Sequence, residues 1–355
     1  MSYIFDGKAL RDVLREKMKL LIMGIVFCAV AVIAAEYLLA SGNTGKPTLY
    51  SGYVGVAGTE NTLAMNRAMH LGIRNYRLDI LLNGSEEQLV ANMSENGASF
   101  LGILDYDTLG VINSNGACIE NCNWSIADWN ASVENAVNAY PSVHKWEIWN
   151  EPLVTMFQDG LQNGSTKNYM MLLKAAYSII KQHNESDTVI CLGGSNMYSG
   201  GPQMDLQSYY WVQELWNMNA SKYCDAISLH MYTGFAYLPS YIPSYGTSIA
   251  DILNISLNLY ENLTKKQIYI TETGIPMNNA TGIPLQYNLN DSLRKQAEFL
   301  NQSFSIFLSK PYVKGVYWFN LEGHEHAGYA LDFGMLNASI FEPRPSFYAF
   351  NSFNK

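Results

Sequence analysis

Short apolar runs and amphipathic stretches alternate along most of the chain. Eight runs rich in Val, Ile, Leu, Tyr or Trp have the length of buried strands. They cover residues 49–54, 72–79, 98–105, 143–149, 188–193, 225–231, 267–273 and 314–320. The stretches with helical spacing between them cover residues 58–70, 86–95, 126–139, 167–183, 206–218, 248–261 and 290–308. Strands that alternate with helices in this way pair in parallel through βαβ units.

Eight strands are the number that closes a (β/α)8 barrel, a TIM barrel, and this is the α/β fold class that we expect for residues 49–355. An open doubly wound sheet is the alternative, but no glycine-rich phosphate loop follows the first strand. The pattern indicates no internal repeat and no second domain. Because barrel sites lie at the C-terminal ends of the strands, the residues that end each apolar run are the candidates for chemistry.

The first forty residues differ from the rest of the chain. Residues 1–19 are a basic leader, and residues 20–40 are apolar except for Glu36 and Tyr37. The apolar run spans a membrane if Glu36 lies at the outer interface. A cleaved signal peptide and an uncleaved membrane anchor both fit, and either places the barrel outside the cytoplasm. Residues 41–48, rich in Gly, Ser, Thr and Pro, are expected to be a linker.

Composition supports an exported protein. Charged residues make up only 15% of the chain and the net charge is −9, against a usual charged fraction of about 25%. No cluster of Lys and Arg follows the leader, so nucleic acid is not an expected partner. Thirteen Asn-x-Ser/Thr sequons lie between Asn83 and Asn337, which predicts a glycoprotein at the cell surface or in the extracellular space.

The chain has five cysteines. Cys118 and Cys122 lie four residues apart in a loop rich in Gly and Asn, where an oxidising exterior would favour a local disulfide. Cys191 and Cys224 border apolar strand-like runs, so we expect them to be buried small hydrophobic residues. We predict neither a metal site nor a cofactor.

Two glutamates follow predicted strands. Glu151 follows the fourth run in the sequence Trp-Asn-Glu-Pro, and Glu272 ends the seventh in Thr-Glu-Thr-Gly. Such carboxylates would face each other across the mouth of a barrel. Retaining glycoside hydrolysis needs a pair of this kind about 5 Å apart, with one group protonated and the other ionised. A β-linked carbohydrate is the ligand that fits this chemistry.

Further strand ends supply groups that would serve the two glutamates. The second run ends in Arg77-Leu78-Asp79, and the charge of Arg77 would lower the pKa of Glu272 and hold it as the anion. Tyr232 follows the sixth run and would donate a hydrogen bond to Glu272. Each residue alone also fits a structural role, such as a salt bridge or core packing. However, these residues and the two glutamates all occur at strand ends in the same register, and this joint occurrence favours an active site.

Three more residues belong to the same candidate site. Asn150 precedes Glu151 and would bind a sugar 2-hydroxyl, a contact that strengthens in the transition state. His230 would orient Glu151 or the sugar. Trp318 would offer a flat face to a pyranose ring.

These motifs resemble glycoside hydrolase clan A, whose members carry Asn-Glu-Pro after strand four and Glu at the end of strand seven. The resemblance covers about residues 49–350 and implies a retaining mechanism with Glu151 as acid/base and Glu272 as nucleophile. It also matches the clan's supporting positions to Arg77, Asn150, His230, Tyr232 and Trp318. The cellulase and mannanase family and the β-xylosidase family resemble the chain about equally. Cellulase-type members often have His near the end of strand three, where this chain has Asp105.

We therefore expect an exported retaining β-glycoside hydrolase that acts on β-linked polysaccharide or oligosaccharide. Two other functions stay open. A membrane-tethered transglycosylase of surface glycans would use the same residues, with a sugar in place of water as the acceptor. A non-catalytic carbohydrate-binding barrel is the third possibility, although a binding protein has no need of the paired carboxylates.

Overall fold

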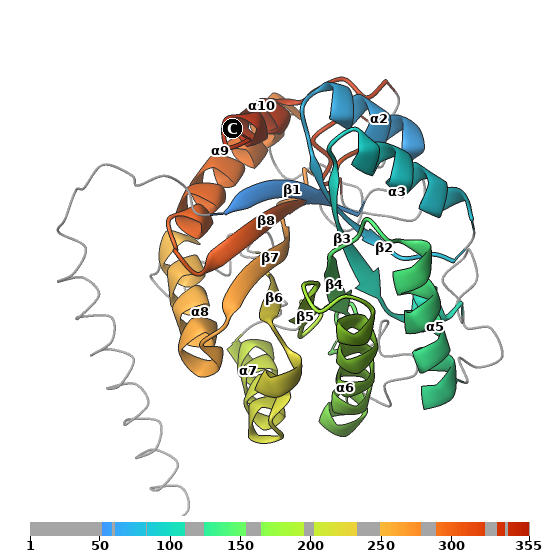
Figure 1. The fold of residues 1–355 in the computed structure, drawn as a ribbon. Coiled ribbons are helices and arrows are strands. Elements are labelled where there is room, and N and C mark those ends of the chain that lie inside the picture. Colours follow the sequence, from blue (N-terminus) through green and yellow to red (C-terminus); the bar gives the residue numbers. More distant parts are fainter. Residues whose placement is uncertain are drawn as a thin grey trace, which may run out of the picture. The chain divides into compact units, whose positions relative to one another are not determined.

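The computed structural model describes most of the chain after the predicted linker. The described residues are 52–58, 61–82, 84–110, 124–153, 165–194, 202–232, 249–277, 289–323, 332–337 and 340–354. Eight parallel strands in this part form a closed barrel in which each strand pairs with the next and β8 pairs with β1 (Figure 1). The predicted (β/α)8 barrel is therefore confirmed.

The strands agree with the predicted apolar runs except at the first. They are β1 (Tyr53–Ala57), β2 (Asn75–Asp79), β3 (Ser99–Leu104), β4 (Lys145–Ile148), β5 (Thr188–Cys191), β6 (Ala226–His230), β7 (Gln267–Thr273) and β8 (Val313–Phe319). The run at 49–54 was expected to be the first strand, but β1 begins at Tyr53. Its buried side chains are those of Val54, Val56 and Ala57.

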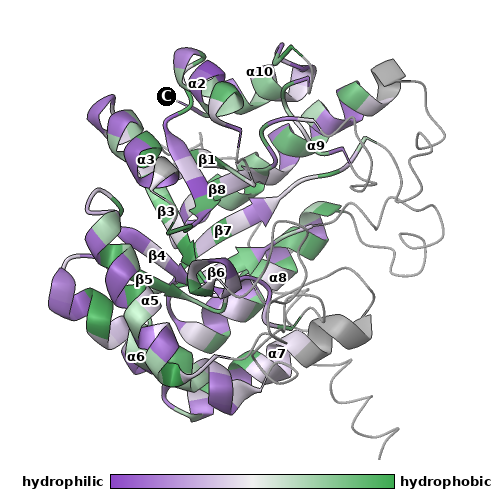
Figure 2. Ribbon diagram, turned by 90° about the vertical axis from the view of Figure 1, so that its right-hand side faces the viewer, coloured by the Kyte–Doolittle hydropathy of each residue, from purple (hydrophilic) through white to green (hydrophobic). Residues whose placement is uncertain are grey.

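Helices surround the barrel in the order that the amphipathic stretches predict. The longer helices are α2 (Thr62–His70), α3 (Ser85–Glu95), α5 (Ile126–Ala139), α6 (Thr166–His183), α7 (Pro202–Asn217), α8 (Ile249–Thr264) and α9 (Leu289–Leu308). Two short helices lie outside the predicted stretches, α4 (Tyr106–Leu109) and α10 (Pro345–Asn351). Figure 2 shows apolar strands at the centre and bands of apolar and polar residues on the helices.

The core has two parts. Inside the barrel, Leu101, Ile190, Tyr269 and Tyr317 pack together, and the hydroxyl groups of Tyr53 and Tyr317 are hydrogen-bonded at 3.0 Å. The larger part lies between the strands and the helices. Residues along each strand alternate between these two parts because successive side chains point to opposite faces. Where a strand is regular, a polar residue at the mouth points into the site when it has the parity of the interior set.

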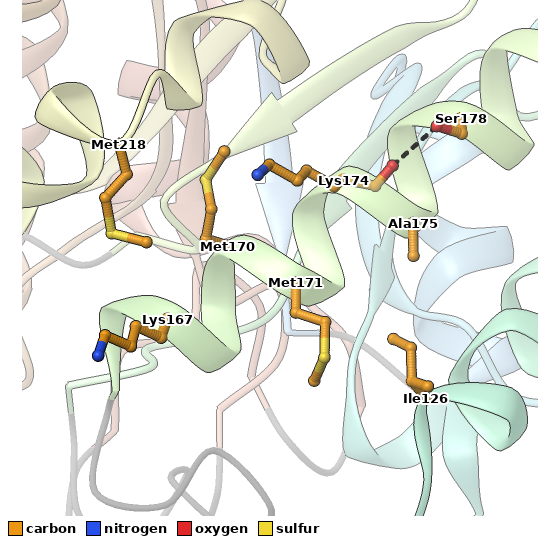
Figure 3. A pocket seen from close by; sticks show the side chains of 8 residues that line it. All are labelled: Ile126, Lys167, Met170, Met171, Lys174, Ala175, Ser178 and Met218. Carbon is orange, nitrogen blue, oxygen red and sulfur yellow. Dashed lines mark hydrogen bonds between the residues drawn. The ribbon is translucent and has the colours of Figure 1, made fainter.

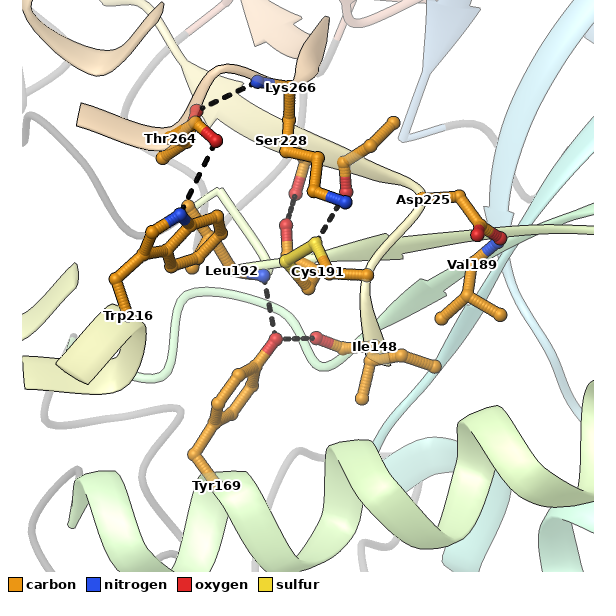
Figure 4. Close-up of a disulfide and its surroundings, with 12 residues drawn as sticks. Ile148, Tyr169, Val189, Cys191, Leu192, Trp216, Asp225, Ser228, Thr264 and Lys266 are labelled. Carbon is orange, nitrogen blue, oxygen red and sulfur yellow. Dashed lines mark hydrogen bonds between the residues drawn. A yellow bond between two sulfur atoms is a disulfide. The ribbon is translucent and has the colours of Figure 1, made fainter. Parts of the chain in front are cut away.

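Cys191 and Cys224 are buried, as the sequence predicted, but they also form a disulfide, which it did not predict (Figure 4). Cys191 ends β5 and Cys224 lies just before β6, and their Cα atoms are 5.6 Å apart. The two strands are neighbours in the barrel, so the fold brings together residues that are 33 positions apart. A disulfide of this kind is typical of proteins in oxidising compartments.

Several predictions concern residues that the structure does not describe. The basic leader at 1–19, the apolar segment at 20–40 and the linker at 41–48 lie outside the described residues, as do Cys118 and Cys122. Within the described part, no helix has both the length and the apolar character needed to cross a membrane.

Candidate active site

The side chains of four predicted site residues meet at the carboxyl ends of the strands. Arg77 lies on β2, Glu151 follows β4, His230 ends β6 and Glu272 lies on β7. All four side chains are buried. Tyr232, two residues after β6, reaches the same point and hydrogen-bonds Glu272.

Arg77 connects three parts of the site. Its Nε donates to Glu147 Oε2 at 2.5 Å, its Nη1 donates to Glu272 Oε1 at 2.6 Å, and its Nη2 donates to Asn150 Oδ1 at 2.9 Å. The guanidinium is 2% exposed and Glu147 is fully buried. Thr271 donates a further hydrogen bond to Glu147 at 3.0 Å. Both carboxylates that flank Arg77 therefore have a fixed cationic partner, and the guanidinium geometry fixes their directions.

Glu272 is surrounded by hydrogen-bond donors. Besides Arg77, the hydroxyl of Tyr232 donates to its Oε2 at 2.5 Å, and His230 Nδ1 lies 3.6 Å from the same oxygen. Burial alone would raise the pKa of this carboxyl group. The charges of His230 and Arg77 and the hydrogen bonds from Tyr232 and Arg77 outweigh burial, so the pKa of Glu272 is lowered. The side chain is thus maintained as an anion inside the barrel mouth.

Tyr232 and His230 keep the protons that these contacts need. Burial and the neighbouring charge of Glu272 raise the pKa of the Tyr232 hydroxyl well above its usual value. Burial would lower the pKa of His230, but Glu272 and Glu151 more than compensate and raise it. Tyr232 therefore acts as a neutral donor, whereas the ring of His230 is biased toward the charged form.

A register shift brings His230 to the two glutamates. The pairing of β6 with β7 is irregular at Leu229 and His230, and as a result His230 lies opposite Glu272. Its Nδ1 is 2.8 Å from Glu151 Oε1. One imidazole thus contacts both carboxylates, as the sequence predicted for Glu151.

The backbone around Glu151 has an unusual conformation. Trp149 has a φ of 69° and Glu151 a φ of 43°, a left-handed region that non-glycine residues seldom occupy. The N–H groups of the two residues donate to Leu104 O at 2.8 Å and to Gly193 O at 2.6 Å. Such conformations cost roughly 1–3 kcal/mol each and persist where surrounding contacts hold them. Here they direct the Glu151 side chain into the mouth.

The turn after β5 supports this arrangement and requires glycine. Gly193 has a φ of 52° and Gly194 a φ of 70°. A Cβ at Gly193 would collide with the carbonyl oxygen of Trp149, and a Cβ at Gly194 would collide with the ring of His230. Both positions therefore need glycine for conformation and for space.

The two glutamates are close together. One carboxylate oxygen of Glu151, one of Glu272 and a ring nitrogen of His230 all lie within 4.8 Å of one another. Glu151 is 9% exposed and Glu272 is 7% exposed. This constellation combines a buried anion, a second carboxyl group and a histidine that contacts both. It provides a nucleophile and a proton carrier within reach of one atom placed between them.

The prediction for Trp318 is wrong. Its side chain is fully buried, packs against Phe299 and Phe304 of α9, and donates from Nε1 to the Phe333 carbonyl at 2.9 Å. It therefore belongs to the layer between strands and helices. Phe319 has the opposite parity. Its ring centroid lies 6.2 Å from that of Tyr232, so Phe319 is the β8 aromatic residue beside the site.

Sequence reasoning missed two groups of residues. Glu147 was ambiguous in sequence, because its role depends on the contact with Arg77 across the barrel. The second group is an acidic cluster formed by Asp79, Asp105 and Asp107, which has carboxylate oxygens within 4.8 Å of one another. Burial and the charges of Asp79 and Asp107 raise the pKa of Asp105 well above its usual value. Asp105 appeared in the sequence only as a departure from the clan pattern.

A separate pocket lies in the helix layer. Met170, Met171 and Lys174 of α6 line it together with Ile126 of α5 and Met218 (Figure 3). None of its lining residues belongs to the strand-end constellation.

Comparisons with known proteins agree with this geometry. The family model described as glycosyl hydrolase catalytic core matches residues 122–339, more than half of the chain. No curated protein matches the chain.

Three solved structures illustrate the likeness in fold. A family 39 glycoside hydrolase from Bacteroides cellulosilyticus has a TM-score of 0.57 at 19% identity, with coverage of 87% of this chain and 65% of that one. A xylanase from Thermotoga petrophila in complex with xylobiose has a TM-score of 0.58 at 17% identity, covering 88% and 98%. An endo-β-1,3-glucanase from Amycolatopsis mediterranei in complex with laminaripentaose has a TM-score of 0.50 at 16% identity, covering 85% and 99%.

The buried ion pair of Arg77 and Glu147 generates a prediction about stability. Arg77→Met leaves Glu147 buried without its cationic partner, so we expect the free energy of unfolding to fall by about 3–5 kcal/mol. Adding Glu147→Gln should restore a large part of this loss. Arg67→Met is the matched control because the Arg67–Glu342 pair is exposed, at 42% and 61%, and 3.6 Å long. Its cost should be at most about 1 kcal/mol.

Denaturant unfolding of the three variants and the wild type provides the measurement. Equal losses for Arg77→Met and Arg67→Met would show that the buried pair has no special importance.

Proposed function

The chain belongs to the glycosyl hydrolase catalytic core family, and from this premise we propose that it hydrolyses β-linked polysaccharide or oligosaccharide with retention of anomeric configuration. The proposal depends most on one observation, the separation of the glutamate oxygens within 4.8 Å. Retaining enzymes hold the two carboxyl groups about 5–5.5 Å apart. Inverting enzymes hold them about 6.5–9.5 Å apart to leave room for a water molecule.

In the proposed first step, Glu272 attacks the anomeric carbon of the sugar. The bond between this carbon and the glycosidic oxygen breaks while Glu151 gives its proton to the departing oxygen. The product is a glycosyl ester on Glu272, formed with inversion. The lowered pKa of Glu272 supports its role as the nucleophile, because the attacking carboxylate must be ionised.

In the second step, Glu151 takes a proton from water, and the water oxygen attacks the anomeric carbon. The ester bond to Glu272 breaks, and a second inversion restores the original configuration. His230 contacts Glu151 at 2.8 Å and serves to position this carboxyl group in both steps. When the ester bond breaks, the hydrogen bonds from Arg77 and Tyr232 stabilise the released carboxylate of Glu272.

Asn150 is suited to recognise the sugar beside the reacting carbon. Its Oδ1 accepts from Arg77 Nη2, and this contact fixes the amide so that the nitrogen acts as the outward donor. One of its protons serves the hydrogen bond with Tyr106. The other is available for the sugar 2-hydroxyl, where a stronger contact in the transition state promotes catalysis.

Complexes of the similar structures support a β-linked glycan as substrate. The xylanase binds xylobiose and the glucanase binds laminaripentaose. A transglycosylase would use the same two steps with a sugar hydroxyl in place of water. Products formed with and without an added acceptor distinguish these activities. Binding without turnover on xylan, β-glucan, β-mannan and aryl β-glycosides would instead indicate a carbohydrate-binding barrel.

We also propose export, with residues 20–40 as a signal peptide or a membrane anchor. The Cys191–Cys224 disulfide supports an oxidising compartment. The structure describes the exposure of eight sequon asparagines, and all eight are exposed or partly exposed. They are Asn92, Asn130, Asn184, Asn219, Asn254, Asn262, Asn301 and Asn337.

The stereochemistry of azide products tests the roles of the two glutamates. Glu272→Ala opens the face opposite the leaving group, so azide should attack an activated aryl β-glycoside once and give the α-glycosyl azide. Glu151→Ala keeps the nucleophile, so azide should attack the covalent intermediate and give the β-glycosyl azide. Its turnover of poor leaving groups should fall by about 10²–10⁴-fold, because only these need the proton. Product configuration is read by NMR.

Glu95→Ala, on the exposed end of α3, is the control and should be insensitive to azide. A β-azide from Glu272→Ala would reverse the two roles. Near wild-type turnover in either active-site variant would remove that residue from the mechanism.

Tyr232→Phe tests how Glu272 is held ionised. The change removes one of the hydrogen bonds that lower the pKa of Glu272, so this pKa should rise. The acid limb of kcat/KM should then move to higher pH, since the nucleophile becomes protonated sooner as the pH falls. Turnover should drop by about 10- to 100-fold, as expected for a lost hydrogen bond to a charged group. Tyr348→Phe, 65% exposed on α10, is the control, and an unmoved acid limb in Tyr232→Phe would reject this role.

Mass spectrometry of the protein from its natural host tests export. We expect a cross-linked peptide pair containing Cys191 and Cys224, and glycans on several of the exposed sequons. A mature N-terminus near residue 41 would identify a cleaved signal peptide, and an intact leader in the membrane fraction would identify an anchor. Free thiols at both cysteines together with bare sequons would contradict export.

A further inference from the structure

We infer that Asp79, Asp105 and Asp107 form a binding site for a divalent cation of the calcium type at the carboxyl ends of β2 and β3. The site would lie beside the proposed catalytic glutamates and would be independent of them. It is also independent of which glycan the barrel acts on.

The positions of the three aspartates follow from the barrel. Asp79 is the last residue of β2, and Asp105 follows β3, the neighbouring strand. Asp105 caps α4, which places Asp107 in the first turn of this helix. The three carboxylates each offer an oxygen within 4.8 Å of the others. Calcium binds oxygen at 2.3–2.6 Å, so two ligands on opposite sides of the ion are about 4.6–5.2 Å apart, and the cluster fits within one coordination shell.

Asp105 carries the second observation. The residue is fully buried, and its Oδ1 accepts the N–H of Asp107 at 2.9 Å. Its Oδ2 is buried as well and has no hydrogen-bond partner. A buried carboxylate oxygen without a donor is costly, and proteins resolve this cost by pairing the charge or by coordinating a metal. Asp79 and Asp107, whose charges act on Asp105, add negative charge and no donor.

The nearby guanidinium gives no hydrogen bond to the buried Oδ2 of Asp105. Arg77 is close enough to influence Asp79 and Asp105 electrostatically, but it donates to Glu147, Glu272 and Asn150. Three hard carboxylate oxygens with excess negative charge are the ligand set that calcium prefers. Asp79 and Asp107 are partly exposed, which gives an ion access and leaves room for water ligands. A bound ion would tie the ends of β2 and β3 to α4.

Calcium binding to the full chain, after treatment with a chelator, tests the site. We expect isothermal titration calorimetry to give one calcium ion per chain. At a concentration about 100 times the dissociation constant, the unfolding midpoint should rise by about 5 °C. Terbium should replace calcium and emit when aromatic residues are excited, because Tyr106 lies between two of the ligands in sequence. Magnesium serves as a second probe and should bind more weakly, because it demands shorter and more regular coordination.

Asp105→Asn is the decisive variant because it removes the charge and retains an oxygen to accept the Asp107 N–H. It should weaken calcium binding by at least about 100-fold and abolish the thermal shift, each carboxylate being a principal ligand. Asp107→Asn should act in the same direction and serves if Asp105→Asn does not fold. Asp251→Asn, exposed on α8, is the matched control and should bind calcium as the wild type does.

Two results would overturn the inference. One is the absence of calcium binding to the wild type at about 10 mM, above the range of weak extracellular calcium sites. The carboxylates would then hold a shared proton instead. The other is unchanged binding in both Asp105→Asn and Asp107→Asn, which would place the ion elsewhere, for example at Glu151, His230 and Glu272.

Discussion

The buried guanidinium of Arg77 is the constraint on which the rest of the site depends. It joins β2 to the fully buried Glu147 on β4 and to Glu272 on β7. Removing these charges from water is expensive, and only good geometry with further hydrogen bonds recovers the cost. Thr271 and Tyr232 supply those bonds. Arg77 therefore pairs with two carboxylates. That of Glu147 is fully buried, and that of Glu272 faces the mouth of the barrel.

This arrangement separates the two glutamates by environment. Glu272 receives hydrogen bonds from Arg77 and Tyr232, whereas Glu151 contacts His230 and stands on a backbone in the left-handed region. The local conformation is maintained by the turn at Gly193 and Gly194, which has no room for a side chain. Packing behind the site thus determines where Glu151 points, and the charges around Glu272 determine its ionisation. Two chemically identical side chains are thus given different electrostatic environments, as the proposed mechanism requires.

Much of this could be predicted from the sequence, because buried parallel strands and strand-end polar residues leave local signals. The eight apolar runs and the placement of Glu151 and Glu272 depend only on such signals. Trp318 failed because successive strand residues face opposite sides, and a one-residue choice between Trp318 and Phe319 reverses the face. The Cys191–Cys224 disulfide and the contact of Glu147 with Arg77 were not predicted, for another reason. Both depend on which strands are neighbours and in what register, which no local pattern contains.

The distribution of charge across the mouth follows from the same geometry. On the side of β4 and β7, the glutamates have Arg77, His230 and Tyr232 as partners. On the side of β2 and β3, the buried Oδ2 of Asp105 has no donor, and two further carboxylates are close by. A single guanidinium makes at most five N–H contacts and lies in one plane, and that of Arg77 is directed to Glu147, Glu272 and Asn150. The buried Oδ2 of Asp105 therefore needs a proton or a bound cation as its partner. The arrangement that holds Glu272 as an anion thus directs the hydrogen bonds of Arg77 away from Asp105 Oδ2.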